Sequence, residues 1–240
     1  MCSTVPSIPL IDDLTSSQIP PGSNILVEFD PASQWYNASL IIAAGWLRSG
    51  GNLAYYVYTR PPDSIRTRLA ALGLNVRELE QEEKLGIHDW YTATLGWKSK
   101  EQNAVESLKV ADLSISYAKT VVRGEDEPVA PGFLVIEENF SVFDRFNEEK
   151  NWIEFYLTRR LPTTPIQKTT ALRAIAKGIH SERAYKPLEA ATDGVIDFKV
   201  EEESGARRSF IGVRNMVNVG FDSRWYPLKL GGNLEISLEK

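Results

Sequence analysis

The segment that most constrains the fold of this chain is formed by residues 24–36, Asn-Ile-Leu-Val-Glu-Phe-Asp-Pro-Ala-Ser-Gln-Trp-Tyr. An apolar strand is followed by a tight connection and then by a long apolar helix, predicted over residues 36–47. This order of elements is the strand–loop–helix frame in which phosphate-binding loops occur. The segment therefore predicts a central strand with a helix packed against it.

The loop of this frame lacks the residues that bind phosphate. Such a loop needs glycines, so that consecutive backbone N–H groups can point at the anion, and a lysine that reaches the terminal phosphates. Here Phe29, Pro31 and Ser33 stand at the glycine positions, Gln34 at the lysine position, and Trp35 at the hydroxyl position that holds magnesium. Since each lost charge-assisted hydrogen bond weakens binding by about 1.5–3 kcal/mol, little nucleotide affinity of the usual kind is expected.

Composition indicates one compact domain covering residues 1–240. The chain is 42% hydrophobic and 25% charged, enough apolar sequence for a sizeable core, and its single cysteine, Cys2, excludes an intramolecular disulfide framework. A net charge of −5 argues against a nucleic-acid partner, because binding a polyanion requires a dense basic surface. The sequence shows neither a secretion signal nor an apolar stretch of about 18–20 residues, so we expect no membrane contact and a cytoplasmic protein.

Strands and helices alternate over most of the chain, which predicts an α/β fold with a mainly parallel central sheet flanked by helices. The predicted strands are residues 24–29, 53–58, 85–88, 133–136 and 170–176, and the predicted helices are residues 36–47, 61–72, 107–122, 143–161 and 181–191. A lead-in of residues 1–23 precedes them. From residue 194 to residue 240 the alternation stops, and strands at 195–202, 209–216, 226–230 and 234–238 predict an antiparallel extension.

Several short phrases in this order resemble a known family. Residues 7–14 (Ser-Ile-Pro-Leu-Ile-Asp-Asp-Leu) and 19–23 (Ile-Pro-Pro-Gly-Ser) are similar to the opening of KaiC-like members of the RecA superfamily of P-loop ATPases. Residues 134–137 (Leu-Val-Ile-Glu) resemble the Walker B strand of that family, with Glu137 where aspartate is usual. Residues 189–197 and 213–218 resemble its terminal strands and closing hairpin, so the likeness runs nearly end to end and implies a RecA-like P-loop NTPase fold.

The same resemblance implies that the chemistry of the family is missing. Its catalytic acids lie just after the second strand, where this chain has Thr59 and Arg60, and neither can act as a base near neutral pH. A neighbouring subunit of the family supplies a lysine and an arginine from the closing hairpin, where this chain has Asn215 and Val217. Phosphoryl transfer depends on such cations, so no catalytic residue is expected.

What remains is a degenerate nucleotide site formed by six residues: Asp30, Ser33, Gln34, Trp35, Tyr36 and Glu137. Glu137 is either a metal-binding carboxylate or a buried, hydrogen-bonded structural acid. Trp35 and Tyr36, with Trp46, form either an aromatic wall that fills the vacated nucleotide space or ordinary core packing. A further hypothesis pairs Arg60 with Glu137 or Glu138 across the cleft.

Other candidate residues carry weaker signals. His88 and His180 are the only histidines, and neither has a cysteine or a second histidine at metal-ligand spacing, so no metal site is predicted. His180 precedes a predicted helix with Ser181 as its cap. The basic pairs Arg159-Arg160 and Arg207-Arg208 are read as solvated faces.

Two functional hypotheses follow. The first is a pseudo-ATPase that has a regulatory or scaffolding role through assembly with itself or with a KaiC/RecA-like paralogue, without a cofactor. The alternative is a switch or ATPase that still binds ATP and magnesium through Gln34, Tyr36 and Glu137 in new roles, in signalling or in the control of DNA recombination. The second rests on family analogy.

Overall fold

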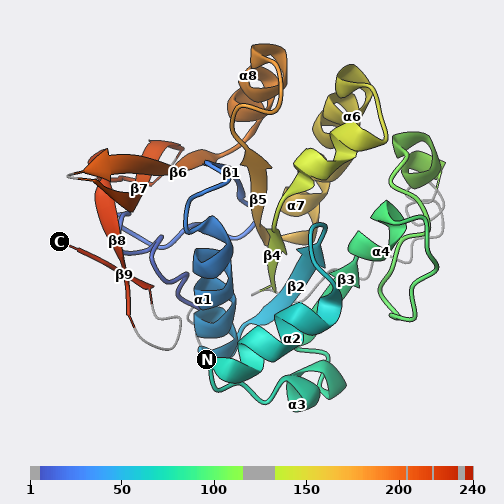
Figure 1. Ribbon diagram of the computed structural model, residues 1–240, viewed down its shortest axis with the longest axis horizontal. Helices are drawn as coiled ribbons and strands as arrows, with labels where there is room; N and C mark the ends of the chain where they lie inside the picture. Colours follow the sequence, from blue (N-terminus) through green and yellow to red (C-terminus); the bar gives the residue numbers. More distant parts are fainter. Residues whose placement is uncertain (1–5, 116–132, 204, 218, 232–235, 240) are drawn as a thin grey trace.

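The computed structural model describes residues 6–115, 133–203, 205–217, 219–231 and 236–239 (Figure 1). Its strands are β1 (Asn24–Phe29), β2 (Asn52–Val57), β3 (Leu85–Asp89), β4 (Phe133–Glu137), β5 (Thr170–Ala176), β6 (Gly194–Glu203), β7 (Ala206–Met216), β8 (Tyr226–Leu230) and β9 (Ile236–Leu238). Its helical segments are α1 (Trp35–Arg48), α2 (Pro62–Ala71), α3 (Val76–Gln81), α4 (Tyr91–Thr94), η1 (Phe140–Arg145), α6 (Glu149–Phe155), η2 (Tyr156–Arg160), α7 (Leu161–Gln167) and α8 (Glu182–Ala191).

The described strands form one sheet in the order β3-β2-β4-β5-β1-β6-β7-β8-β9. Strands β3 to β6 of this order pair in parallel, and β1 lies at the centre between β5 and β6. The pairs β6–β7, β7–β8 and β8–β9 are antiparallel. The structure thus confirms the α/β prediction of a mainly parallel sheet with antiparallel strands at its C-terminal end.

Helices cover both faces of the sheet (Figure 1). On one face α1 and α2 contribute apolar side chains such as Leu40, Ile42 and Ile65 to a core that includes Val27 of β1. On the other face Phe140 of η1, together with side chains of α6, η2, α7 and α8, packs in a second core. Alternate residues of β4 and β1 point to opposite faces, because side chains in a strand alternate.

Two predicted helices differ from the observed ones. The helix expected over residues 143–161 is broken into the 3₁₀ segment η1, helix α6 and the π-helical segment η2, which continues into α7. Pro162 and Pro165 are accommodated in α7, which extends past the predicted end. Of the helix predicted over residues 107–122, residues 110–115 are helical, residues 107–109 are not, and residues 116–122 lie outside the described residues.

The lead-in packs into the first core and reaches the C-terminal extension. Ile8, Leu10, Ile11, Leu14 and Ile19 are buried there. The backbone N–H of residue 16 donates to the carbonyl of residue 220 at 2.7 Å, and residues 15 and 221 form an isolated antiparallel bridge. None of the helices in the described part of the chain is long and apolar enough to cross a membrane.

Candidate functional site

The loop between β1 and α1 is a compact turn. The N–H of Ser33 donates to the carbonyl of Asp30 at 2.8 Å, and the Asp30 carboxylate accepts the backbone N–H of Val200 in β6 at 2.9 Å. No residue from 30 to 34 has a left-handed backbone conformation. Concave arrays of N–H groups that bind anions use such conformations, so this loop does not form one of that kind.

Trp35, the first residue of α1, is part of the core behind this loop. Its side chain is 2% exposed, and its indole Nε1–H donates to the backbone carbonyl of Glu138 at 2.8 Å. The ring lies 5.2 Å from the ring of Phe198 in an edge-to-face arrangement and 6.4 Å from that of Phe29. The indole therefore links the start of α1 to the end of β4, through the Glu138 carbonyl, and to Phe198 within β6.

Tyr36 lies at the rim and carries a cation on its ring. The guanidinium carbon of Arg60 is 3.7 Å from the ring centroid, and that of Arg68 is 5.3 Å away. Burial raises the pKa of the Tyr36 hydroxyl, which lies 3.4 Å from that of Ser64. Trp46 does not join this group, because it lies eleven residues along α1, about 16 Å away at the rise of a helix. Its indole instead donates to the carbonyl of Asn52 at 2.9 Å.

Gln34 stands at the position expected for the lysine, and its side chain is hydrogen-bonded to a residue three positions further along the chain. Its side-chain oxygen accepts a hydrogen bond from the Asn37 amide at 2.7 Å. Gln34 caps α1 without a side-chain hydrogen bond to the helix backbone. The candidate residues Asp30, Ser33, Gln34, Trp35 and Tyr36 therefore lie together at one end of α1, as the sequence predicts.

Glu138, one residue beyond β4, lies on the same side as this loop. Its Oε1 accepts the backbone N–H groups of Tyr58 and Thr59, at 2.8 and 2.7 Å, and the Thr59 hydroxyl at 2.9 Å. Within the described part of the chain, its buried Oε2 has no hydrogen-bond partner, and neither has the buried Nε of Arg60. Burial raises the pKa of Glu138 although these N–H groups and Arg60 oppose the shift.

Glu137, the neighbouring residue, lies within the opposite face. Its Oε1 accepts from Arg160 Nη2 and from Arg173 Nη1, and its Oε2 accepts from the Tyr156 hydroxyl at 2.6 Å. Burial acts to raise the pKa of Glu137, but the charges of Arg160 and Arg173 outweigh it and hold that pKa below its usual range. The Walker B-like carboxylate therefore has two arginines as its cations, and Arg60 makes no ion pair with it or with Glu138. The hypothesis of an Arg60 salt bridge across the cleft is wrong.

The sequence does contain a signal for the ion-pair cluster around Glu137, although the spacing of motifs does not reveal it. Arg173 stands within β5, whose seven residues are all buried, and a buried arginine requires an acid nearby. Arg173 also donates to Thr164 Oγ1 at 2.9 Å and to Asn24 Oδ1 at 3.2 Å. The pairing of β4 with β5 sets Glu137 directly beside it.

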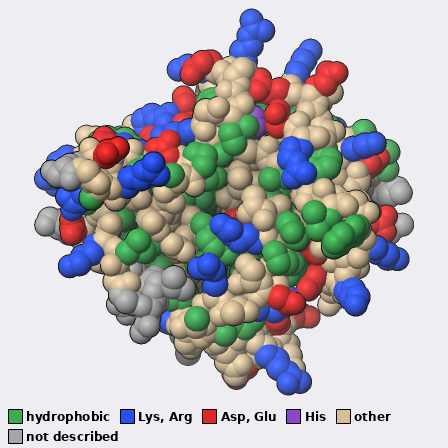
Figure 2. Space-filling model, viewed as in Figure 1, with side chains coloured by type: hydrophobic (Ala, Val, Ile, Leu, Met, Phe, Trp, Pro, Cys, Tyr) green, Lys and Arg blue, Asp and Glu red, His purple; other side chains and the backbone are tan. Residues whose placement is uncertain are grey.

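The prediction that the basic pairs form solvated faces holds for Arg159, Arg207 and Arg208, which are exposed, and fails for Arg160. Arg160 is buried beneath η2 against Glu137, because the π-helical segment turns it inward, so the prediction is wrong for this residue. Arg208 is exposed and pairs with Glu239 at 2.6 Å. On the face visible in Figure 2, Lys and Arg side chains are interspersed with acidic ones.

The closing hairpin offers an arginine that is engaged within its own chain. Arg214 of β7 contacts Glu28 at 2.7 Å, Glu189 at 2.7 Å and Asp197 at 2.5 Å. Burial acts to lower the pKa of Arg214, but the carboxylates of Asp197 and Glu28 outweigh it and raise that pKa above its usual range. Asn215 and Val217, where the resemblance expects cations, carry no charge.

His88 of β3 lines a cavity beside Tyr56 of β2, and no residue of the loop between β1 and α1 is among its lining residues. The cavity measures about 570 Å³, and its walls include Tyr56, Trp90, Asn103 and Arg160. The imidazole stacks on Tyr56 with ring centroids 4.3 Å apart. Burial and the charge of Arg160 lower the pKa of His88 to about 4, so the ring is neutral near pH 7.

No protein-family model matches the sequence, and no curated protein sequence is significantly similar to it. Among solved structures, the chain is similar to the KaiC-like protein PH0186 from the hyperthermophilic archaeon Pyrococcus horikoshii OT3, with a TM-score of 0.71 and 17% identity over 99% of this chain and 98% of that one. It is also similar to the flagellar accessory protein FlaH from Methanocaldococcus jannaschii, with a TM-score of 0.69 and 11% identity over 98% and 96% of the two chains. These similarities confirm the KaiC-like, RecA-type fold that the sequence resemblance predicts.

Proposed function

We propose that this protein is a pseudo-ATPase: a KaiC/RecA-like fold that neither binds ATP in the usual way nor hydrolyses it, and that acts as a regulatory or scaffolding subunit. In this proposal the fold serves assembly, either between copies of the chain or with a paralogue. No catalytic residue and no cofactor take part.

The observation that carries the proposal is the position of Trp35. A phosphate-binding loop keeps open space and free N–H groups in front of the first helix. Here the indole is packed into the core and hydrogen-bonded to the carbonyl of Glu138, and the Asp30 carboxylate is engaged by β6. Opening the loop for a triphosphate would therefore require breaking contacts that stabilise the folded chain.

The charges around the loop support the same proposal. The Glu137 carboxylate forms ion pairs with two arginines and accepts a hydrogen bond from a tyrosine, so binding Mg²⁺ would require it to exchange these partners. Arg214 is held by three acids of its own chain, which leaves it poorly placed to reach a phosphate on a neighbour. Thr59 contributes its N–H and hydroxyl to Glu138 and supplies no base.

Support for assembly comes from the C-terminal extension. Val217, Trp225 and Leu230 are large apolar side chains that are exposed there. The sequence resemblance places contacts between subunits at this closing hairpin. Apolar side chains on such a surface favour a protein partner over open solvent.

The alternative function, a nucleotide-binding switch with altered contacts, has one observation in its favour. Glu138 Oε2 and Arg60 Nε are buried polar atoms without hydrogen-bond partners, and both belong to residues at the rim of the loop. Buried polar atoms of this kind are rare in folded proteins. A ligand with a donor and an acceptor group would satisfy both, whereas the pseudo-ATPase proposal leaves them to water.

Thermal unfolding of the full chain with millimolar ATP or ADP, with and without Mg²⁺, separates the two functions. A ligand present at 100 times its dissociation constant stabilises the folded state by about 2.7 kcal/mol. We expect no shift in the unfolding midpoint beyond that caused by Mg²⁺ alone. A magnesium-dependent shift with ATP would overturn the pseudo-ATPase proposal and favour the switch.

The assembly part of the proposal requires a separate measurement. Sedimentation of the purified chain at increasing concentration is expected to show a species larger than a monomer, or a stable complex with a co-expressed KaiC-like paralogue. A Trp225→Ser variant should weaken either association, while Trp97→Ser, an exposed tryptophan outside the extension, should not. A strict monomer that binds no paralogue would contradict the scaffolding role.

A further inference from the structure

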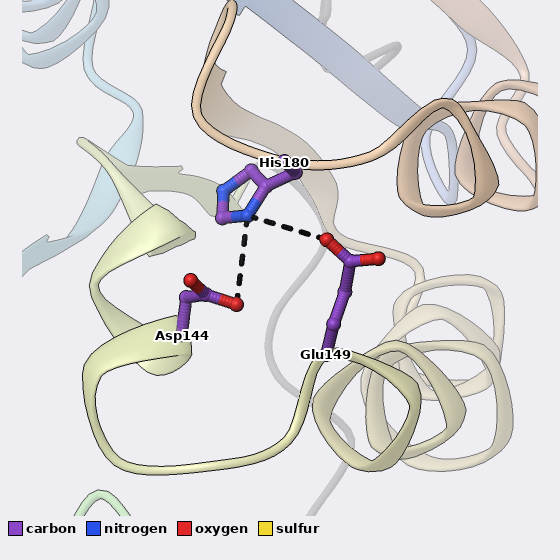
Figure 3. A group of neighbouring side chains, drawn as sticks. All are labelled: Asp144, Glu149 and His180. Carbon is purple, nitrogen blue, oxygen red and sulfur yellow. Dashed lines mark ion pairs between the residues drawn. The ribbon is translucent and has the colours of Figure 1, made fainter.

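The connection between β5 and α8 brings His180 against the turn that links η1 to α6. Figure 3 shows the imidazole facing two carboxylates, one from Asp144 at the end of η1 and one from Glu149 in the first turn of α6. Nδ1 of His180 lies 3.8 Å from Asp144 Oδ1 and 4.0 Å from Glu149 Oε2. One ligand atom from each residue lies within 4.8 Å of those from the other two.

The imidazole of His180 is buried and unsatisfied. Its side chain is 0% exposed, and neither ring nitrogen has a hydrogen-bond partner among the residues that the structure describes. Its neighbours are aromatic: the ring of Trp152 is 5.1 Å away and that of Tyr185 is 6.0 Å away. Because most buried polar side-chain atoms are hydrogen-bonded, an imidazole nitrogen that points at two acids without bonding to either needs an explanation.

The spacing suits a cation between the three groups better than direct bonding. Distances of 3.8 and 4.0 Å are too long for hydrogen bonds. With metal–nitrogen and metal–oxygen bonds of about 2.0–2.2 Å, two tetrahedral ligands of one zinc ion lie about 3.4 Å apart. The two distances from His180 then need to close by roughly half an ångström, and the two carboxylate oxygens, which lie within 4.8 Å of each other, by at most about 1.4 Å. Asp144 and Glu149 are partly exposed and can make that movement.

Glu149 is already oriented for this role. Its Oε2 accepts the backbone N–H of Ser181 at 2.9 Å, and its Oε1 accepts the Ser181 hydroxyl. Ser181 precedes α8 as the sequence predicts, but its side chain makes no capping bond and serves Glu149 instead. Trp152 Nε1–H lies 3.4 Å from Asp144 Oδ1. Such outer contacts fix the direction of metal-binding carboxylates in known sites.

We propose that Asp144, Glu149 and His180 form a binding site for a divalent transition-metal ion, with Zn²⁺ as the best match. One imidazole and two carboxylates are a donor set that zinc accepts, and three protein ligands leave a fourth position for water or an external ligand. The site shares no residue with the loop between β1 and α1. Bound metal would tie the β5–α8 connection to the η1–α6 turn.

The neutral state of His180 is consistent with this assignment. Burial lowers the pKa of His180, against the opposing effect of the Asp144 and Glu149 charges. The groups that face the ring are these two carboxylates, together with Trp152 and Tyr185, and none of them is a cation. An imidazole that is neutral near pH 7 can bind a metal, whereas its protonated form would only pair with the acids.

The test is equilibrium dialysis and titration calorimetry of the full chain with Zn²⁺ after treatment with a chelator. A Cys2→Ser background removes the only thiol, which could otherwise bind zinc by itself. We expect one ion per chain in this background. The pair Glu149→Gln and Glu148→Gln is a matched comparison, because Glu148 is the adjacent exposed glutamate. Glu149→Gln should weaken binding at least tenfold and Glu148→Gln should leave it unchanged.

Histidine variants complete the test. His180→Gln should abolish binding, and His88→Gln should retain one ion per chain. Because His180 is buried, circular dichroism must show that its variant is folded, and Asp144→Asn, at an exposed position, gives a second and gentler disruption. A Co²⁺ spectrum with absorption bands of a low-coordinate site should disappear in the same variants. Failure to bind micromolar Zn²⁺, or equal binding by the Glu149→Gln and Glu148→Gln variants, overturns the proposal and leaves the nucleotide question untouched.

Discussion

Glu137 and Glu138 are adjacent in sequence at the end of β4, yet they lie in two different environments. The Glu137 carboxylate is closed in by two arginines and a tyrosine on the face covered by α6 to α8. The Glu138 carboxylate lies next to the loop between β1 and α1. One of its oxygens accepts two backbone N–H groups, and the other has no hydrogen-bond partner among the described residues. The pKa of the first is lowered and that of the second is raised.

The difference shows that Glu137 is a structural acid, whereas Glu138 keeps one carboxylate oxygen available for a ligand. The Glu137 cluster uses its charges to hold β4, β5 and η2 together, and additional binding there would require breaking ion pairs. The Glu138 region retains unsatisfied polar atoms in Glu138 and Arg60. A ligand that binds beside the loop between β1 and α1 would therefore contact Glu138 rather than the Walker B-like Glu137, whose carboxylate already has three partners.

The largest expected effect is that of Glu137→Ala. Removing the acid leaves Arg160 and Arg173 buried without a counter-charge, and breaking a buried ion pair from one side costs about 3–5 kcal/mol. Urea unfolding of the variant should show a loss of that size. Adding Arg173→Met to the variant should recover part of it, because one uncompensated charge is removed.

Glu138→Ala is the matched change on the other side of the comparison. It leaves two backbone N–H groups without an acceptor, which costs about 1–3 kcal/mol. Equal losses for the two alanine variants, or a larger loss at Glu138, would show that the Glu137 cluster does not stabilise the fold more than its neighbour does.

A loss of the same order as that of Glu138→Ala is expected for Trp35→Phe. Phenylalanine keeps a ring in the core but cannot donate to the Glu138 carbonyl, so unfolding should become easier by about 1–3 kcal/mol. Trp46→Phe removes a similar bond to Asn52 at the far end of α1 and serves as the control. Neither variant should gain affinity for ATP in a thermal-shift titration, and a gain in Trp35→Phe alone would mean that the indole is what blocks the nucleotide.

The two glutamates should also give pH dependences of opposite sign. The pKa of Glu137 is lowered from 4.5 in the folded state, so its contribution to stability is full above that value and is lost as pH falls through the folded pKa. The pKa of Glu138 is raised from 4.5, so the folded chain binds a proton more readily and its stability relative to Glu138→Gln falls as pH rises through the folded pKa. Urea unfolding of the wild type and of each Glu→Gln variant over a pH range that extends well below and well above 4.5 measures both slopes, and slopes of the same sign would contradict the assignment.

The smallest effect is expected for Gln34→Lys. The side chain is near the surface and contacts only Asn37 among the described side chains, so stability should change by less than about 0.5 kcal/mol. Restoring the lysine alone should not restore ATP binding, because Trp35 and the backbone of the loop are unchanged. Measurable ATP hydrolysis by this variant would require the rest of the site to be functional.

The fold was largely predictable from the sequence because its signals are local. The apolar run of β1, the helix after it and the all-buried β5 have patterns that need no knowledge of the rest of the chain. The broken helix after β4 is different: its 3₁₀ and π-helical segments depend on how Phe140 and Tyr156 pack, with rings 4.3 Å apart. Packing of that kind is not visible in a periodicity.

The candidate site was predictable only in part, and the reason is again the range of the interactions. The residues of the loop between β1 and α1 are contiguous, so their sequence alone places them side by side. The partners of Glu137 come from η2 and β5, and the acids beside His180 come from two other segments, so their positions require the strand order. Arg160 was misassigned because a basic pair in a helix is usually solvated, and the π-helical turn that buries it has no sequence signature.

The position of β1 has a consequence for how the chain is made. Both of its neighbours come much later in the chain, since Asn24 pairs with Ala171 and Ile25 with Gly194, so both edges of β1 stay unpaired until those residues have been synthesised. Contacts between such distant segments slow folding, and unpaired apolar strands are prone to aggregate. The nascent chain thus carries the apolar strand β1 without its neighbours until β5 and β6 have been synthesised, and we expect productive folding to require that this strand stays shielded during that time.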